Sequence, residues 1–256
     1  MSDYYKPDRN PAWNYGGKQF RLSRSKIGLY LECPRCFYID NKLGTARPPG
    51  YPFNLNSAVD ALLKKEFDIH RVARTAHPLM QAYGIKAVPF EHAELNRWRE
   101  NFKGIEFAHP KTGFVISGAI DDVWVKPDGE LIIVDYKSTS KEERVEALDK
   151  EWHEGYKRQM ETYQWLFRQN GFVVSDTGYF VYANASKDEK AFDGILKFEL
   201  TLVPYEGDDS WVERTLRDIK ACLDSDTPPE AAPDCDYCRY RAAAGGKLLE
   251  LKKAGK

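Results

Sequence analysis

Two short segments place carboxylates and a lysine at spacings that could hold a metal ion. Gly118-Ala-Ile-Asp121 and Asp135-Tyr-Lys137 lie on either side of Lys126-Pro-Asp-Gly-Glu130. In this middle stretch the proline presets φ and the glycine accepts a positive φ, so it predicts a tight turn between two strands. Carboxylate oxygens are the ligands that Mg²⁺ and Mn²⁺ prefer. The lysine could orient a metal-activated water or stabilise charge that develops on a phosphate.

The predicted turn also sets the register of the two strands. If the turn is centred on Asp128, Asp121 lies opposite Asp135, and Lys137 shares their face. Two like charges that face each other destabilise a sheet unless a cation lies between them, which favours a divalent ion here. An Asp-x-Lys pattern alone is more typical of an exposed strand end with weak surface ion pairs. The upstream segment, across the turn, favours the metal site instead.

A polar residue interrupts an apolar helix face further along the chain. Five residues recur at 4-3-4-3 spacing and form one stripe: Trp152, Tyr156, Gln159, Tyr163 and Leu166. Gln159 is an amide where a core residue is expected, and it could reach a metal-bound water or a phosphate, with Tyr163 one turn later. The alternative is a core glutamine that backbone groups satisfy.

The periodicity of apolar residues predicts an α/β fold with a mixed sheet. Helices are expected over about residues 23–40, with Ser23 as the cap, 55–74, 91–101, 141–170 and 210–223. Strands are expected at about residues 105–108, 113–125, 131–136, 177–183 and 195–203.

Four of the five cysteines form two Cys-x-x-Cys pairs, Cys33-Pro-Arg-Cys36 and Cys235-Asp-Tyr-Cys238. Such a pair spans a single turn, so both of its thiolates can bind the same ion. Together the pairs make a four-thiolate site that suits zinc or an iron–sulfur cluster, and it would join the first helix to the C-terminal tail. The alternative is four unrelated reduced thiols. Cys222 falls on the last predicted helix as a buried thiol.

Length and charge narrow the class of protein. The 256 residues carry a formal net charge of −1, which excludes a uniformly basic nucleic-acid binder. The chain shows no signal-peptide pattern and no apolar run near the ~20 residues of a membrane span. We therefore expect a cytoplasmic protein with no membrane partner. Basic residues do gather around the first predicted helix, where they could contact phosphates or form a solvated face: Arg21, Arg24, Lys26 and Arg35.

Taken in order, the motifs resemble the RecB-like branch of the PD-(D/E)XK nuclease superfamily, which includes CRISPR-associated adaptation nucleases and the AddB nuclease domain. The resemblance rests on Gly118-x-x-Asp121, Asp135-x-Lys137 and Gln159-x-x-x-Tyr163. It implies a restriction-endonuclease-like core, in which a mixed central sheet is flanked by helices. It also implies a single nuclease domain over residues 1–256, with an extended arm (1–20), a helical part (21–104), a catalytic core (105–203) and a C-terminal helix with the cysteine-containing tail (204–256).

The resemblance assigns roles to individual residues. Those expected at the catalytic centre are Asp121, Asp135, Lys137, Gln159 and Tyr163. Asp121, Asp135 and the carbonyl of Tyr136 would bind Mg²⁺ or Mn²⁺. Members of the family often carry a Gly-x-x-x-His motif, whose His is a further ligand, on a helix before the sheet. The matching stretch here is Asn56-Ser-Ala-Val-Asp60, so Asp60 would supply an oxygen ligand in place of the imidazole, or would be a solvated helix residue.

Iron–sulfur members of this family also join their ends through four cysteines. Their usual division is one upstream and three downstream, whereas this chain has two and two. The resemblance favours a 4Fe–4S cluster at the two pairs, with zinc as the alternative.

The implied function is metal-dependent hydrolysis of DNA phosphodiester bonds. Exonuclease-like action on single-stranded or frayed DNA is expected, in repair, recombination or CRISPR-type processing, with a helicase or a CRISPR adaptation protein as a candidate partner. The departure at Asn56 and Asp60 keeps open a nucleic-acid-binding subunit with a degenerate nuclease core. A restriction-type endonuclease is a further alternative. The oligomeric state stays unknown.

Overall fold

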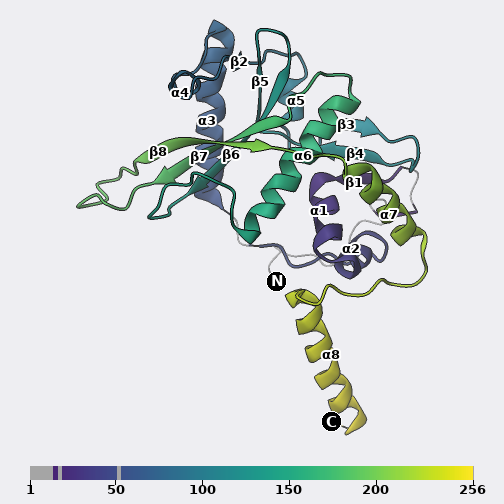
Figure 1. The fold of residues 1–256 in the computed structure, drawn as a ribbon. Helices are drawn as coiled ribbons and strands as arrows, with labels where there is room; N and C mark the ends of the chain where they lie inside the picture. Colours follow the sequence, from purple (N-terminus) through teal and green to yellow (C-terminus); the bar gives the residue numbers. More distant parts are fainter. Residues whose placement is uncertain (1–13, 17–18, 51–52, 256) are drawn as a thin grey trace. The chain divides into compact units, whose positions relative to one another are not determined.

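The chain divides into two compact units in a computed structural model that describes residues 14–16, 19–50 and 53–255 (Figure 1). The first unit takes its described residues from Met1–Tyr51, Ala108–Ile116 and Glu213–Lys256, and the second from Pro52–Phe107 and Ser117–Val212. Most of the arm expected at residues 1–20 lies outside the described residues. The single-domain organisation stays a prediction. No helix in the described part of the chain is long and apolar enough to cross a membrane.

The first unit is mainly helical. Its elements are β1 (Arg21–Ser23), α1 (Arg24–Glu32), α2 (Pro34–Asn41), most of α7 (Val212–Asp224) and α8 (Asp236–Lys253). The backbone N–H of Val115 donates to the carbonyl of Phe20, and the rings of Phe20 and Phe114 pack edge to face at 5.3 Å. β1 and α8 were not predicted from the sequence.

The single helix expected over residues 23–40 is wrong, because it breaks at Cys33. Ser23 does cap α1, accepting a hydrogen bond from the N–H of Lys26. Cys33, however, is extended, with φ −158° and ψ 103°, and Pro34 begins α2. A residue before proline is pushed out of the helical region, and proline suits the first position of a new helix. Cys33 therefore lies between the two helices, whereas Cys36 lies within α2.

The second unit contains the five-stranded sheet. Its elements are α3 (Asn54–Ala73), α4 (Pro78–Ala82), β2 (Val88–Pro89), α5 (Leu95–Trp98), β5 (Asp122–Val125), β6 (Leu131–Thr139), a 3₁₀ turn (Glu151–His153), α6 (Glu154–Gln169), β7 (Thr177–Ala185) and β8 (Phe198–Glu206). β3 (Ile105–Ala108) and β4 (Val115–Gly118) each cross the boundary between the units. The strand order is β2-β5-β6-β7-β8, and only the β6–β7 pair is parallel. The mixed α/β architecture predicted from the sequence is confirmed.

The central strand β6 presents its two faces to two different helices (Figure 1). Val134 and Tyr136 pack in one apolar cluster with Leu63 and Phe67 of α3. Asp135 lies on the opposite face, where it accepts a hydrogen bond from Gln159 of α6. Because side chains of a strand alternate between faces, this arrangement also points Lys137 towards α6.

The predicted hairpin register is confirmed over the paired residues. Asp122 pairs with Val134 and Val125 with Leu131, which is the register expected from a turn centred on Asp128. The one long strand expected over residues 113–125 is wrong, because β4 ends at Gly118 and β5 begins at Asp122. The N–H of Ile120, between them, donates to the carbonyl of Trp98 instead of to a strand. Asp121 is therefore the residue directly before Asp122, which forms the pair of the ladder furthest from the turn.

Other boundaries differ from the expected ones. The helix expected over residues 141–170 begins only at Glu154, because residues 141–150 are held by tertiary contacts: Lys141 exchanges hydrogen bonds with the side chain of Asn184, and Val145 is buried. Trp152 thus lies before the helix and is exposed. The helix expected over 91–101 is reduced to the single turn of α5, whereas α3 matches its expected range closely.

Candidate active site

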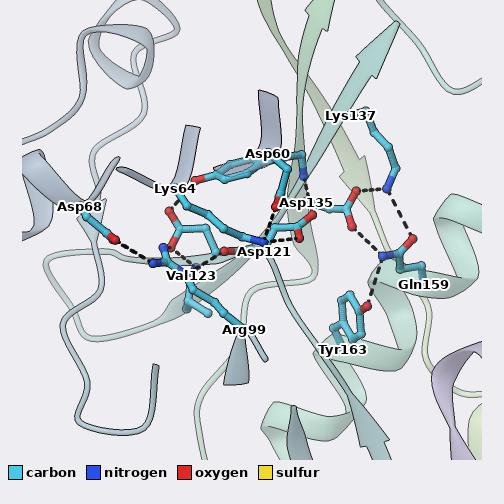
Figure 2. Close-up of polar contacts among 12 residues, drawn as sticks. Asp60, Lys64, Asp68, Arg99, Asp121, Val123, Asp135, Lys137, Gln159 and Tyr163 are labelled. Carbon is cyan, nitrogen blue, oxygen red and sulfur yellow. Dashed lines mark hydrogen bonds and ion pairs between the residues drawn. The ribbon is translucent and has the colours of Figure 1, made fainter. Parts of the chain in front are cut away.

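Asp121 lies at the entrance of β5, where two elements contact its two oxygens. Its Oδ2 accepts a hydrogen bond from the backbone N–H of Tyr136 at 2.9 Å. Its Oδ1 forms an ion pair with the Nζ of Lys64, on α3, at 3.2 Å. The same Nζ lies 2.8 Å from Oδ2 of Asp60, one turn earlier on α3. Figure 2 shows the Lys64 ammonium between the two carboxylates.

Asp135, fully buried on β6, is the second carboxylate of the site. Its Oδ1 accepts a hydrogen bond from Nε2 of Gln159 at 2.7 Å, and its Oδ2 is ion-paired with Nζ of Lys137. Lys137 also donates to Oε1 of Gln159 at 3.4 Å. The Nε2 of Gln159 lies 3.2 Å from the hydroxyl of Tyr163, so four of the five residues expected at the catalytic centre are joined in one network (Figure 2).

The surroundings of Lys137 favour the protonated, positively charged form of its side chain. Burial lowers the pKa of its ammonium, but the nearby charges of Asp135 and Asp121 outweigh this effect, and the net result is a raised pKa. The Nζ also lies 4.5 Å from the centroid of the Tyr156 ring, a cation–π distance. Lys137 is therefore a cation placed next to both carboxylates.

The carboxylate of Asp122 has other surroundings than that of its neighbour Asp121. Its carboxylate is fully buried and accepts hydrogen bonds from Arg71, Arg99 and the hydroxyl of Tyr136. Burial lowers the pKa of Arg99, but the charge of Asp122 and the hydrogen bond and charge of Asp68 together outweigh burial, and the pKa is raised. The carboxylate of Asp122 is part of a buried ion-pair cluster, so Asp121 is the one of the two aspartates that is available to bind an ion.

Gly118 is required by the close packing of Tyr163. A Cβ atom at Gly118 would lie 2.6 Å from Cε1 of Tyr163 and 3.2 Å from Cδ1 of Leu166. The carbonyl of Gly118 in turn approaches Gly104, which has a positive φ of 68°. The glycine in the Gly-x-x-Asp motif therefore lets α6 approach the chain just before Asp121.

The donor chemistry of these residues suits a hard divalent ion. A carboxylate has about four lone-pair positions, so Asp121, which is bonded to Tyr136 N–H and Lys64, keeps acceptor capacity beyond these contacts. Oxygen donors are those that Mg²⁺ and Mn²⁺ take. Among the described residues, however, the only set of three or more Cys, His, Asp or Glu side chains close enough for a shared ion is the four cysteines. Asp60 as a ligand stays a prediction, since its carboxylate is paired with Lys64.

The two Cys-x-x-Cys pairs do come together, within the first unit. All four sulfur atoms lie within 4.8 Å of one another and are buried. The Sγ of Cys36 is 3.5 Å from Cys238 and 3.6 Å from Cys235, and Cys33 is 3.8 Å from Cys238. Burial raises the pKa of Cys33, but hydrogen bonds from the backbone N–H groups of Ala232 and Cys36 lower it to about 6. Burial raises the pKa of Cys36 to about 12 and raises that of Cys238 as well, so the lowered pKa belongs to Cys33.

The four basic residues proposed to contact DNA all lie in the first unit. Arg35 donates to the carbonyl of Pro229 at 2.8 Å and pairs with Glu230, so it has a structural role there. Lys26 donates to the carbonyl of Arg21 and lies 4.8 Å from the Phe20 ring. Contact of these residues, and of Arg24, with a nucleic acid stays a prediction.

Lys64 is the residue of the site that the sequence reasoning missed. The signal was present, because Lys64 follows Asp60 by four residues on a helix that was correctly predicted, and an i, i+4 pair shares a helix face. That Lys64 also meets Asp121 depends on how α3 packs on the sheet, which no local pattern shows.

Comparison with known proteins identifies the family of this chain. The chain finds no match among curated proteins. A solved structure titled "Crystal structure of SSO0001" is 16% identical and covers 82% of this chain and 79% of its own, with a TM-score of 0.33. The family described as "PD-(D/E)XK nuclease superfamily" matches residues 21–243, which include both carboxylates, Lys137 and all four clustered cysteines. The chain belongs to the PD-(D/E)XK nuclease superfamily.

Proposed function

We propose that this protein is a Mg²⁺- or Mn²⁺-dependent nuclease that hydrolyses DNA phosphodiester bonds. The observation that carries the proposal is the network of Asp135, Lys137 and Gln159 beside Asp121. Two carboxylates and a buried ammonium gather at one end of the β5–β6 hairpin, in a family of nucleases. The resemblance to the RecB-like branch supports DNA as the substrate.

Each side chain has a distinct part in this proposal. Asp121, Asp135 and the carbonyl of Tyr136 would hold the ion, which supplies Lewis-acid activation of water and neutralises phosphate charge. Lys137, kept protonated by the two aspartates, stabilises negative charge that develops on the phosphoryl group. Gln159 bonds both Asp135 and Lys137 and so fixes their relative position. Tyr163 supports Gln159 from the next helix turn.

The direct test is digestion of linear DNA with Mn²⁺ and with EDTA. We expect Lys137→Ala to lose at least about 100-fold in rate, the usual range for removal of one electrostatic contributor. Lys141→Ala is the matched control, because this exposed lysine lies four residues further on and does not contact the carboxylates. A Lys137→Ala protein that digests DNA as fast as the parent contradicts the assignment.

The mode of cleavage is the finer part of the proposal. We infer an exonuclease-like action on single-stranded or frayed ends, in DNA repair, recombination or CRISPR-type processing, with a helicase or CRISPR adaptation partner, by analogy with the RecB-like branch. Parallel assays on linear and closed circular DNA test it. Progressive loss of linear DNA with circular DNA intact is expected. Discrete fragments would favour a restriction-type endonuclease.

One observation favours a second function, a DNA-binding subunit that has lost catalysis. The Lys64 ammonium already lies between Asp60 and Asp121, where a ligand for an ion was expected. Filter binding of labelled DNA, measured beside the digestion, separates the two functions. Tight binding without cleavage in any divalent ion would establish the second.

At the cysteines we infer a single zinc ion, in preference to the 4Fe–4S cluster. Four thiolates around one zinc at ~2.3 Å form a tetrahedron with edges of about 3.8 Å. Three of the sulfur–sulfur distances, 3.5, 3.6 and 3.8 Å, agree with that edge. In a 4Fe–4S cluster each thiolate binds a different iron, so the sulfurs stand further apart. Arg47 donates to Cys235 at 3.2 Å and offsets the negative charge of such a site.

A further inference from the structure

The ammonium of Lys64 lies between two carboxylates beside the proposed metal site. Its Nζ lies 2.8 Å from Oδ2 of Asp60 and 3.2 Å from Oδ1 of Asp121, and its side chain is only 21% exposed. Two-metal nucleases keep their ions roughly 3.5–4 Å apart and need carboxylates that face both of them. Here the space between these two carboxylates is taken by a side chain anchored on α3 (Figure 2).

The contacts of Asp121 and Asp135 show which lone pairs are still available. Each oxygen of Asp121 has one protein donor, Lys64 on Oδ1 and Tyr136 N–H on Oδ2. Asp135 is paired with Gln159 through Oδ1 and with Lys137 through Oδ2. Since a carboxylate oxygen has about two lone-pair positions, Oδ1 of Asp121 keeps one position while Lys64 takes the other. This oxygen could therefore bind one ion, but it could bridge two ions only if Lys64 were displaced.

The net charge of the site also limits the number of divalent ions that it can bind. Asp60, Asp121 and Asp135 with Lys64 and Lys137 leave one net negative charge. One divalent ion changes this to one net positive charge, and a second would leave three positive charges inside a partly buried site. Like charges at such distances repel strongly where water is excluded. The site therefore has charge for a single divalent ion.

We propose that the ammonium of Lys64 substitutes for the second metal ion, so that this nuclease works with one divalent ion, and that Asp60 positions Lys64 and does not bind metal. The inference rests on the proposed function for the location of the first ion, at Asp121 and Asp135. Lys64 is a positioning residue in this scheme, because it orients Asp121 and balances charge at a fixed point.

The test counts Mn²⁺ ions bound to the full-length, zinc-loaded protein without DNA. Free Mn²⁺ gives a sharp electron paramagnetic resonance signal that vanishes on binding, so a titration gives the number of sites. We expect one Mn²⁺ in the parent and two in Lys64→Met, which keeps the length of the side chain and removes its charge. Lys65→Met is the matched control, because Lys65 is the exposed neighbour on the same helix, and one Mn²⁺ is expected there.

Two results would overturn the inference: a parent that binds two ions, or a folded Lys64→Met that still saturates at one. If Lys64→Met does not fold, as judged by circular dichroism, the parent count alone decides, since two ions refute the proposal and one supports it. Asp121→Asn tells this failure apart from a failure of the proposed function. If that variant keeps the parent's bound ion, the ion is not at Asp121 and the proposed active site is wrong, whatever Lys64 does.

Discussion

At the scale of single residues, two adjacent aspartates have opposite roles. Asp122 is buried against two arginines and a tyrosine hydroxyl, whereas Asp121 is partly exposed and keeps acceptor capacity for an ion. The residue type is the same, but Asp122 is the first residue of β5 and Asp121 lies just before the strand, so the two side chains reach different surroundings. We therefore expect a substitution of Asp122 to affect mainly stability and a substitution of Asp121 to affect mainly activity.

We expect Asp122→Ala to destabilise the protein by about 3–5 kcal/mol, because it takes from Arg71 and Arg99 the buried carboxylate that they share and leaves them paired only with the more exposed Asp68. Asp121→Asn keeps the shape of the side chain and should change the free energy of unfolding by less than about 1 kcal/mol while abolishing Mn²⁺-dependent cleavage. Urea unfolding and DNA digestion of both variants measure the two effects. An active Asp121→Asn protein would remove this aspartate from the proposed site.

The Gly118 position makes a second prediction at this scale. Gly118→Ala should lower the free energy of unfolding by roughly 1–3 kcal/mol. The new Cβ would lie 2.6 Å from the buried ring of Tyr163, and this ring has little room to move. Gly155→Ala is the control, since no atom lies within 4 Å of its Cβ position and the residue lies in α6. There alanine should stabilise the helix by up to about 1 kcal/mol. Thermal unfolding of both variants compares them, and equal melting temperatures would show that the contact carries no cost.

At the scale of elements, α6 must be fixed because it carries Gln159 and Tyr163. Its anchor is the buried Glu161, which accepts hydrogen bonds from the hydroxyl of Tyr205 and from Nε1 of Trp211 at 2.7 Å. The two donors lie on β8 and on the segment after it, so the carboxylate of Glu161 links α6 to the edge of the sheet. Burial and the Glu161 charge raise the pKa of Tyr205, which keeps its hydroxyl protonated as a donor.

Glu161→Ala should lower the free energy of unfolding by roughly 2–3 kcal/mol, because hydrogen bonds to a charged group are among the stronger ones and the half-buried Tyr205 and Trp211 would lose their acceptor. Glu154→Ala, at an exposed position of the same helix, should change it by less than about 0.5 kcal/mol. Urea denaturation of the two variants measures the difference. Similar midpoints for both would mean that α6 is held by its apolar face alone.

The elements also show what the sequence could predict. The hairpin register followed from the turn residues and the alternation, both of which are local, and so did the extent of α3. The break at Cys33 had a local signal in Pro34 that the apolar periodicity masked. The interruption of the strand at residues 119–121 and the late start of α6 depend on contacts with Trp98 and Asn184, which lie far away in sequence. Tertiary contacts override local preference at such places, and the same holds for Lys64 meeting Asp121.

At the scale of the whole chain, the cysteine cluster connects segments that lie at opposite ends of the sequence. Cys33 and Cys238 are 205 positions apart, and every residue of the second unit lies between them in the chain. A link that closes a loop of this length removes chain entropy worth about 5 kcal/mol from the unfolded state. A metal there also adds its own binding free energy to folding.

Metal removal therefore tests the organisation of the whole molecule. We expect one zinc and no iron per chain, no visible absorption, and a melting temperature lowered by about 10–20 °C after treatment with a strong chelator or in Cys36→Ser, since each kcal/mol shifts a chain of this size by roughly 2–4 °C. Cys222→Ser is the control, because this half-buried thiol lies outside the cluster and the variant should keep its zinc. A brown, iron-containing protein after anaerobic purification would restore the 4Fe–4S assignment. A protein whose melting temperature does not respond to the chelator or to Cys36→Ser would show that the four thiols do not hold the chain ends together.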